Sequence, residues 1–484
     1  MTRPVATYLM LLVLIALMLA ITVRAARRTH NAADFILGSR RLGAWTAALG
    51  YTGGVTNAWV LTLMCAAAFS WGMSALWLWP AMLLGCVINL WFVAPRLRAA
   101  SLAQSHATLI QVLSADAGGR LQPAVARSAV FILTVTLLLL ASAALRFGAD
   151  VLQVELAFTG GGVIMLTLTL IVISLFSGGL FAASLCDAAQ TALLLGSAVL
   201  LLPPAWIAAG SWGELWAGLG ALSPESLDIF GGRSGVAAVA FVAGTFGLGL
   251  VMPGQAHALS RCMAVRDEAA LGRLRWIALG WIAVLLAAVL LCGWSASVMY
   301  AGLEDSRQAM IALAMRMLPL WAGSVFLLAL AGAIMLGIAS LLLTVSTSFA
   351  LDLGYGAASS SLARCRVALI IAAALLCSLV TYVPGTSLDR GFFAFTALGA
   401  SLGPLLLVRL SGKRIRPGST LGAMWSGFIL SVLFHLLPDA PGDFLERVLP
   451  FIAALGIALS GGERRRNPDR ADRSEETIHD RLPI

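Results

Sequence analysis

Long apolar runs without charge recur along this sequence and limit its possible folds more than any other feature. Residues 71–95 and 318–351, for example, contain no charged side chain. About 20 apolar residues in a helix cross the hydrocarbon core of a bilayer. The composition agrees, with 60 % hydrophobic and 11 % charged residues and a mean hydropathy of +0.92. The sequence therefore predicts an all-α polytopic membrane protein.

We expect thirteen transmembrane helices, because thirteen segments are long and apolar enough to cross a bilayer. Residues 5–24 are read as a retained helix, not a cleaved signal peptide, because the run is long and Arg24, Arg27 and Arg28 follow it. The predicted spans are 5–24, 44–68, 71–95, 126–150, 160–180, 186–210, 234–259, 274–300, 319–350, 365–384, 390–410, 420–438 and 444–461.

Basic residues alternate between the connections of these spans. Clusters such as Arg261/Arg266/Arg273/Arg275 lie on one side, and acids such as Glu225, Asp228, Glu304 and Asp305 lie on the other. The positive-inside rule then places the N-terminus outside and the C-terminus inside. We expect a multi-pass protein of the cell inner (plasma) membrane.

The net charge of +9 is explained by these cytoplasmic loops, which face anionic lipid headgroups. Membrane lipid is thus an expected partner and nucleic acid is not, since no basic stripe is interleaved with exposed aromatic residues. The seven cysteines form no CxxC or Cys/His spacing. The sequence shows no nucleophile–base group, phosphate-binding loop or metal triad, so we expect neither an enzyme nor an organic cofactor.

Two predicted spans are interrupted by glycines. Span 2 contains Gly50, Gly53 and Gly54 within "YTGGVTNAW" (51–59), and span 7 contains five breaker residues within "FVAGTFGLGLVMPGQAH". The breakers of span 7 are Gly244, Gly247, Gly249, Pro253 and Gly254.

The two broken spans lie five apart, so they enter the membrane from opposite sides. That pattern is typical of inverted repeats whose broken helices meet at a midplane binding site. The alternative is that the small residues only allow close helix packing.

This pattern divides the chain into five parts. Residues 1–43 hold an extra N-terminal helix and a cytoplasmic loop, 44–210 the first repeat (spans 2–6) and 234–410 the second repeat (spans 7–11). Residues 411–461 hold two further helices, and 462–484 form a charged, disordered cytoplasmic tail.

Four motifs stand out along the chain: "DFILGSRRLGAWTAALG" before the first break, "SLFSGGLFAASLCDAAQ" (174–190), "AGAIMLGIASLLLTVSTSFALDL" (331–353) and "ALGASLGPLLL" (397–407). Together they resemble the sodium:solute symporter family, most closely its sodium/proline symporter branch. The resemblance covers roughly residues 34 to 460. It implies a LeuT-like five-plus-five fold and sodium-driven import of a small solute by alternating access.

In that family, backbone carbonyls and two hydroxyls hold a sodium ion. Carried over, the carbonyl positions are Gly53, Thr56 and Ala333, and the hydroxyl positions fall on Leu336 and Gly337, whose side chains have no oxygen. Because a hard cation requires oxygen ligands, the resemblance implies a degenerate site. Sodium stays a possible coupling ion. Ser340 lies one turn from Leu336 and could supply one hydroxyl.

The substrate positions also depart from the proline-binding pattern. The resemblance places aromatic and proline residues of the family at Leu248, Met252 and Ala256, which implies a roomier or more apolar pocket. The full set of expected substrate-binding residues is Thr52, Gly53, Gly54, Asn57, Trp59, Leu248, Met252 and Ala256.

The remaining polar residues are candidates for coupling or gating. Asp187 is either a gate residue or a helix cap. Arg146 either replaces a lost cation or attracts an anion, or else it snorkels or pairs with Asp150. His257 is either a proton shuttle or a hydrogen-bonded helix-end residue.

Three functions stay open at this level. The first is secondary active import of a small organic solute coupled to sodium. The second is sodium-independent transport, proton-coupled or facilitative, of a different or larger solute. The third is a non-transporting receptor or accessory subunit. The sequence does not indicate the solute, a homo-oligomeric state or an accessory protein.

Overall fold

The computed structural model describes residues 3–116, 119–155, 160–353, 362–382, 387–437 and 441–463. The charged tail predicted for residues 462–484 lies almost wholly outside these ranges. In the described part, helices dominate and the strands are limited to one short antiparallel pair, β1 (Arg414–Ile415) with β2 (Gly462–Glu463).

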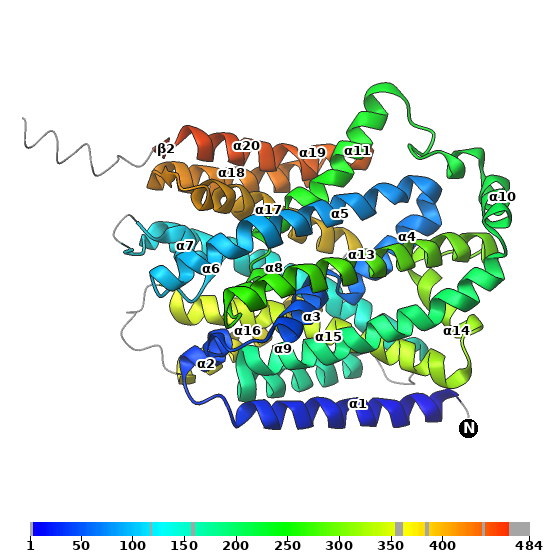
Figure 1. Ribbon diagram of the computed structural model, residues 1–484, viewed down its shortest axis with the longest axis horizontal. Helices are drawn as coiled ribbons and strands as arrows, with labels where there is room; N and C mark the ends of the chain where they lie inside the picture. Colours follow the sequence, from blue (N-terminus) through cyan, green and yellow to red (C-terminus); the bar gives the residue numbers. More distant parts are fainter. Residues whose placement is uncertain are drawn as a thin grey trace, which may run out of the picture.

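Helices occupy every segment that the sequence predicts to span the membrane. Long helices lie side by side with their axes along one direction, and connections gather at the two ends of the bundle (Figure 1). In chain order the principal helices are α1 (Arg3–Ala26), α2 (Ala32–Leu37), α3 (Ala44–Val55), α4 (Ala58–Trp71), α5 (Leu78–Val87), α6 (Ala94–Ala103), α7 (Leu109–Ser114), α8 (Pro123–Glu155), α9 (Gly160–Ala209), α10 (Trp212–Leu222), α11 (Gly235–Leu250), α12 (Ala256–Met263), α13 (Glu268–Met299), α14 (Ala309–Met317), α15 (Leu320–Leu351), α16 (Leu362–Tyr382), α17 (Ser387–Leu410), α18 (Pro417–His435), α19 (Phe444–Arg447) and α20 (Leu449–Ser460).

Short 3₁₀ and π segments join some of these helices, among them η2 (Gly72–Trp77), η3 (Ile88–Val93), η5 (Met252–Gly254), η6 (Ser306–Gln308) and η8 (Pro441–Asp443). By length and composition, nine helical stretches in the described ranges could cross a membrane, and α1 adds a shorter apolar stretch, Leu11–Ala26. The remaining predicted spans are built from interrupted or shorter helices.

The run labelled α9 comprises two helices that meet at a kink at Gly179, and these correspond to predicted spans 5 and 6. Gly179 has φ +52°, a left-handed conformation that glycine adopts without steric cost. A Cβ at this position would also collide with the backbone of Phe35 on α2. The kink therefore lies where α2 packs against α9, beside the predicted end of span 5 at residue 180.

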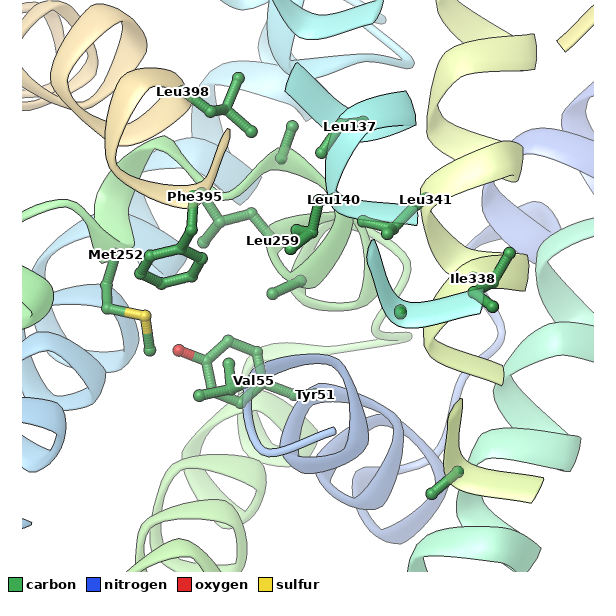
Figure 2. Close-up of a cluster of buried hydrophobic side chains, with 14 of the residues drawn as sticks. Tyr51, Val55, Leu137, Leu140, Met252, Leu259, Ile338, Leu341, Phe395 and Leu398 are labelled. Atoms are coloured by element: carbon green, nitrogen blue, oxygen red, sulfur yellow. The ribbon is translucent and has the colours of Figure 1, made fainter. Parts of the chain in front are cut away.

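One cluster of the apolar core lies where α3, α8, α12, α15 and α17 converge (Figure 2). Tyr51 and Val55 from α3 face Met252 and Phe395, while leucines of α8 and α12 fill the space above them. All of the labelled side chains are buried. This cluster lies beside both broken helices and therefore borders the expected site.

Candidate functional site

The first helix break lies at Thr56 and Asn57, which separate α3 from α4. The Thr56 N–H and hydroxyl both donate to the Thr52 carbonyl, at 2.7 and 2.8 Å, and close the last turn of α3. The Asn57 side chain accepts from the Val60 N–H at 3.1 Å and caps α4. The carbonyls that end α3 are therefore left without intrahelical donors.

The glycines of this helix have a different role from the one that the sequence predicts. Gly50, Gly53 and Gly54 all lie inside α3, so they do not interrupt it. A Cβ on Gly53 would collide with the Thr191 hydroxyl of α9, and one on Gly54 would lie 3.7 Å from Ala258 on α12. Gly53 thus lets α3 pack closely against α9, as the alternative interpretation proposes, whereas a Cβ at Gly54 would make only ordinary contact with α12.

The second break runs from Val251 to Gln255, between α11 and α12. As in the first broken helix, most of the predicted breaker glycines are helical. Gly244, Gly247 and Gly249 lie inside α11, and only Pro253 and Gly254 lie in the interruption. Side chains of neighbouring helices satisfy part of the freed backbone, as the low-polarity surroundings require. Asn89 donates to the Met252 carbonyl at 3.1 Å.

A cavity of about 190 Å³ lies beside the two breaks, on the side predicted to face outside. Its walls come from α4, α5, η6, α11, α17 and α19 and are largely apolar. Its lining residues are Val60, Leu63, Met64, Ala66, Ala67, Ser70, Trp71, Leu78, Met82, Leu248, Ser306, Phe392, Phe395 and Arg447. We call this space the outer cavity.

Phe395 lines the outer cavity and also belongs to the buried cluster with Tyr51 and Met252 (Figure 2). A second space of about 30 Å³, the inner cavity, is lined by Ala256 and Ser260 of α12 and by Thr344, among others. The two broken helices thus have a larger space on the predicted outer side and a smaller one on the predicted inner side.

The structure distributes the predicted substrate residues over several places. Leu248 lines the outer cavity, Met252 is buried beside Phe395, and Ala256 lines the inner cavity. Thr52 is fully buried, and Asn57 caps α4. The side chain of Trp59 lies outside the described residues.

Below the first break, three buried polar side chains meet. Arg261 of α12 donates to the carboxylate of Asp187 of α9 and to the hydroxyl of Ser340 of α15. The Ser340 hydroxyl also lies 3.4 Å from the Asp187 carboxylate. We call these three residues the ion-pair cluster. It brings together two predicted gating residues and an arginine that the sequence analysis assigned only to a basic loop.

The ion-pair cluster lies about one helical turn inward of the expected sodium position. Ser340 follows Leu336 by one turn, and the side chain of Arg261 lies 3.5 Å from the place of a Cβ on Gly50, one turn before Gly53. Gly337 faces Asn57, and Ala333 is buried on the same helix. The side chain of Leu336 lies outside the described residues. The described part of α15 therefore packs against the first helix break, but it does not supply the two expected hydroxyls there.

His257 lies on α12 between the first break and the ion-pair cluster. Its Nε2 lies 3.3 Å from the Gly54 carbonyl, and its backbone carbonyl accepts from Arg261. The residue is buried. His257 therefore ties the second broken helix to the end of the first.

Arg146 lies away from both cavities. Its guanidinium donates to the Val380 carbonyl in the last turn of α16, where helix carbonyls lack intrahelical donors and the dipole favours a cation. The side chain of Asp150, its predicted partner, lies outside the described residues.

Three residues were missed as site candidates: Arg261, Thr191 and Arg447. The spacing of Arg261 from His257, four residues along one short helix, was the available signal for the first. Thr191 also follows Asp187 by four residues, and Arg447 follows Asp443 by four residues. Their tertiary neighbours are distant in sequence, so spacing alone does not indicate the contacts.

The sodium:solute symporter family model matches residues 35–429. The chain belongs to the sodium:solute symporter family. Among similar proteins, an osmoregulated proline transporter of Bacillus subtilis (strain 168) is 29 % identical over 461 residues, covering 92 % of each chain. A sodium/proline symporter of Staphylococcus aureus is 25 % identical over 444 residues, covering 88 % of this chain and 85 % of its own.

Two solved structures share the fold. A sodium-coupled sialic acid symporter in a substrate-bound outward-open state aligns with a TM-score of 0.77 and 15 % identity, covering 96 % of this chain and 99 % of its own. A nucleobase-cation-symport-1 family transporter in a closed conformation aligns with a TM-score of 0.56 and 14 % identity, covering 89 % and 94 %. The predicted all-α, LeuT-like five-plus-five membrane fold is confirmed.

Proposed function

We propose that this protein is a secondary transporter that imports a small organic solute across the inner membrane by alternating access. The observation that carries the proposal is the pair of broken helices, α3/α4 and α11/α12, which lie between an outer and an inner cavity. Half-helix ends supply dipoles at such a place without needing ionised side chains. Membership of a transporter family supports the same function.

Sodium is the first candidate for the coupling ion, because the family and two of the similar proteins are named for it. In this chain the ion would be a co-substrate held largely by backbone oxygens of Gly53, Thr56 and Ala333. The weak point is the side-chain contribution, since Gly337 has no hydroxyl and Asp187 already has Arg261 as its counter-ion.

The ion-pair cluster favours a second candidate, sodium-independent transport. The positive charge of Arg261 lies beside an acid and a hydroxyl, about one turn from the expected sodium position. A permanent cation there would neutralise Asp187 throughout the cycle, and no ion would then need to bind or leave. In this alternative, the solute moves by facilitated diffusion or with a proton.

The deciding experiment is uptake of a broad panel of labelled solutes into proteoliposomes, with sodium or choline outside and at two pH values. Uptake that requires a sodium gradient supports the first candidate. Uptake that is equal in choline supports the second, and a pH dependence then separates proton coupling from facilitation. Failure to accumulate or exchange any solute of the panel would contradict transport and favour a receptor or accessory subunit.

A further inference from the structure

We propose that Arg447, carried by the hairpin between the last two spans, binds the carboxylate of an anionic solute with an apolar body in the outer cavity. This inference rests on the proposed transport function and names the chemical class of its substrate. The hairpin comprises η8 and α19, residues 441–447, and lies outside the two predicted repeats.

The chemistry of the outer cavity is that of an apolar pocket with one charge. Among its described lining residues, Arg447 is the only charged side chain, and Ser70 and Ser306 are the hydroxyl-bearing ones. The remaining wall is formed by leucines, methionines, alanines, a valine and aromatic residues. Pockets of this type bind the body of a ligand through apolar contact and fix its orientation with a few polar groups.

Close backbone packing holds the hairpin against α11. A Cβ on Gly244 would collide with the backbone of Gly442, and one on Gly247 would lie 2.8 Å from the Arg447 Cβ. Gly442 itself has φ +66°, and a Cβ there would collide with the backbone of Phe241. Gly244 and Gly247, which the sequence analysis assigned to the break of span 7, therefore make room for the hairpin that carries Arg447.

The Arg447 side chain is only 4 % exposed, although it lines a cavity. Its guanidinium donates to the Asp443 carboxylate and, at 3.3 Å, to the Gly442 carbonyl. It also lies 5.1 Å from the centre of the Phe392 ring, which lines the same cavity. A guanidinium fixed in this way is pre-organised for a carboxylate, which it can hold through two parallel hydrogen bonds.

Asp443 is the built-in competitor for this solute. Its side chain is 34 % exposed, much more than that of Arg447, and it is not among the cavity-lining residues. The more exposed partner loses less when it exchanges its contact for water. An incoming carboxylate can thus take the place of Asp443, or lie beside it, on the guanidinium. Since none of the described lining residues is acidic and able to hold a cationic group, the cavity favours an anion over a cation.

The test is a thermal-shift measurement on the purified full-length protein in detergent. The probes are phenylacetate and 4-methylpentanoate, with phenylacetamide and 4-methylpentanamide as uncharged counterparts. We expect both acids to raise the unfolding temperature and both amides to have little effect. Arg447→Gln should weaken acid binding by about tenfold or more, and Arg447→Lys by less, because lysine keeps the charge and loses the planar fork.

Asp443→Asn should have the opposite effect and tighten acid binding severalfold, since the internal competitor is removed. A purely structural ion pair would make both substitutions weaken binding. Arg316→Gln is the matched control, because Arg316 also lies over an aromatic ring, that of Tyr300, but is exposed and does not line the cavity. If Arg447→Gln fails to fold, Arg447→Lys and Asp443→Asn still test the proposal.

Binding of amides and acids alike, no binding of either acid, or acid binding unchanged in Arg447→Gln would overturn the proposal. Uptake assays separate this outcome from failure of the transport function. Uptake of a neutral solute with an unaltered KM in Arg447→Gln overturns the arginine assignment and leaves transport intact. Acid binding that requires Arg447, in a protein that moves neither the acids nor any other solute of the panel, supports the assignment and contradicts transport.

Discussion

Arg261 of α12 and Asp187 of α9 form an ion pair in which the two side chains are 1 % and 3 % exposed. Asp187 belongs to the first predicted repeat, and Arg261 and Ser340 belong to the second. The ion-pair cluster therefore joins the halves that must move relative to each other if the protein alternates between outward- and inward-facing states. Both its stability and its charge have testable consequences.

Removing one partner of the pair should be more harmful than removing both. Asp187→Asn or Arg261→Gln leaves a buried group without its counterpart, and such changes cost on the order of 3–5 kcal/mol. The double substitution Asp187→Asn/Arg261→Gln should recover much of the loss, because neither group is then charged. Thermal unfolding of the four proteins in detergent forms a double-mutant cycle that measures the coupling.

Arg266→Gln is the control for the ion-pair cycle, because Arg266 pairs with Asp267 while 55 % exposed, and such surface pairs contribute about 0–1 kcal/mol. Additive losses from the two single substitutions at Asp187 and Arg261 would contradict a coupled pair. The same single variants also test the second transport candidate. If Arg261 acts as a fixed cation, Arg261→Gln should make uptake respond to sodium.

Hydroxyls introduced at the degenerate positions should increase sodium dependence. Leu336→Ser with Gly337→Ser places two oxygen-bearing side chains on α15, and Gly337 already lies against the break at Asn57. Because sodium prefers oxygen ligands, we expect half-maximal uptake at a lower sodium concentration. Sodium titration of uptake measures the effect. Gly337→Ala is the matched control without a hydroxyl, and an identical response of both variants would contradict the assignment of these positions.

The sequence was sufficient to predict the helical membrane fold and the two interrupted helices. Hydrophobic length determines the spans, and proline with glycine marks the break before Gln255. It did not distinguish breaking glycines from packing glycines. Gly53 and Gly247 have ordinary helical neighbours in sequence, and only the helix or hairpin packed against each one explains why a side chain is excluded.

The contacts of the candidate site were less predictable than the helices. Asp187 and Arg261 are 74 residues apart, and nothing in local spacing indicates that they pair. Arg447 was read as part of the last span, and its position in the outer cavity follows from the hairpin packing on α11. Side-chain pairing across helices depends on how the helices pack, which periodicity within one helix does not determine.

Close packing at Gly53 predicts a specific clash. Gly53→Ala adds a Cβ that would overlap the Thr191 hydroxyl, so α3 or α9 must shift. We expect a loss of about 1–3 kcal/mol, as for other overpacked cores, although alanine favours helix more than glycine. Thr191→Ala in the same protein should restore much of it. Gly196→Ala is the control on α9, where nothing lies within 4 Å, and thermal unfolding in detergent is the measurement. Equal losses at positions 53 and 196 would contradict the packing role.

Asp352 predicts a pH dependence that arises outside the membrane spans. It follows the last residue of α15, is 1 % exposed, and accepts from the Thr108 hydroxyl at 2.9 Å. Burial raises the pKa of Asp352 to about 7 in the folded protein, despite hydrogen bonds from Thr108, Gln111 and Ser348 that lower it. The folded state thus binds this proton more tightly than the unfolded state, and its contribution to stability is lost as the pH rises towards 7.

Asp352→Asn should therefore stabilise the protein more at alkaline pH than at acidic pH. At about pH 3, below the pKa of Asp352 in both the folded and the unfolded chain, the wild type and the variant carry a neutral side chain in both states and should unfold at similar temperatures. At about pH 8 the variant should unfold a few °C higher. Asp34→Asn is the control of opposite sign. Burial raises the pKa of Asp34, but hydrogen bonds from Ser39 and the His30 backbone outweigh it and the pKa is lowered, so this contribution is lost towards acid. A difference between Asp352→Asn and the wild type that stays constant with pH would contradict a buried, titrating Asp352.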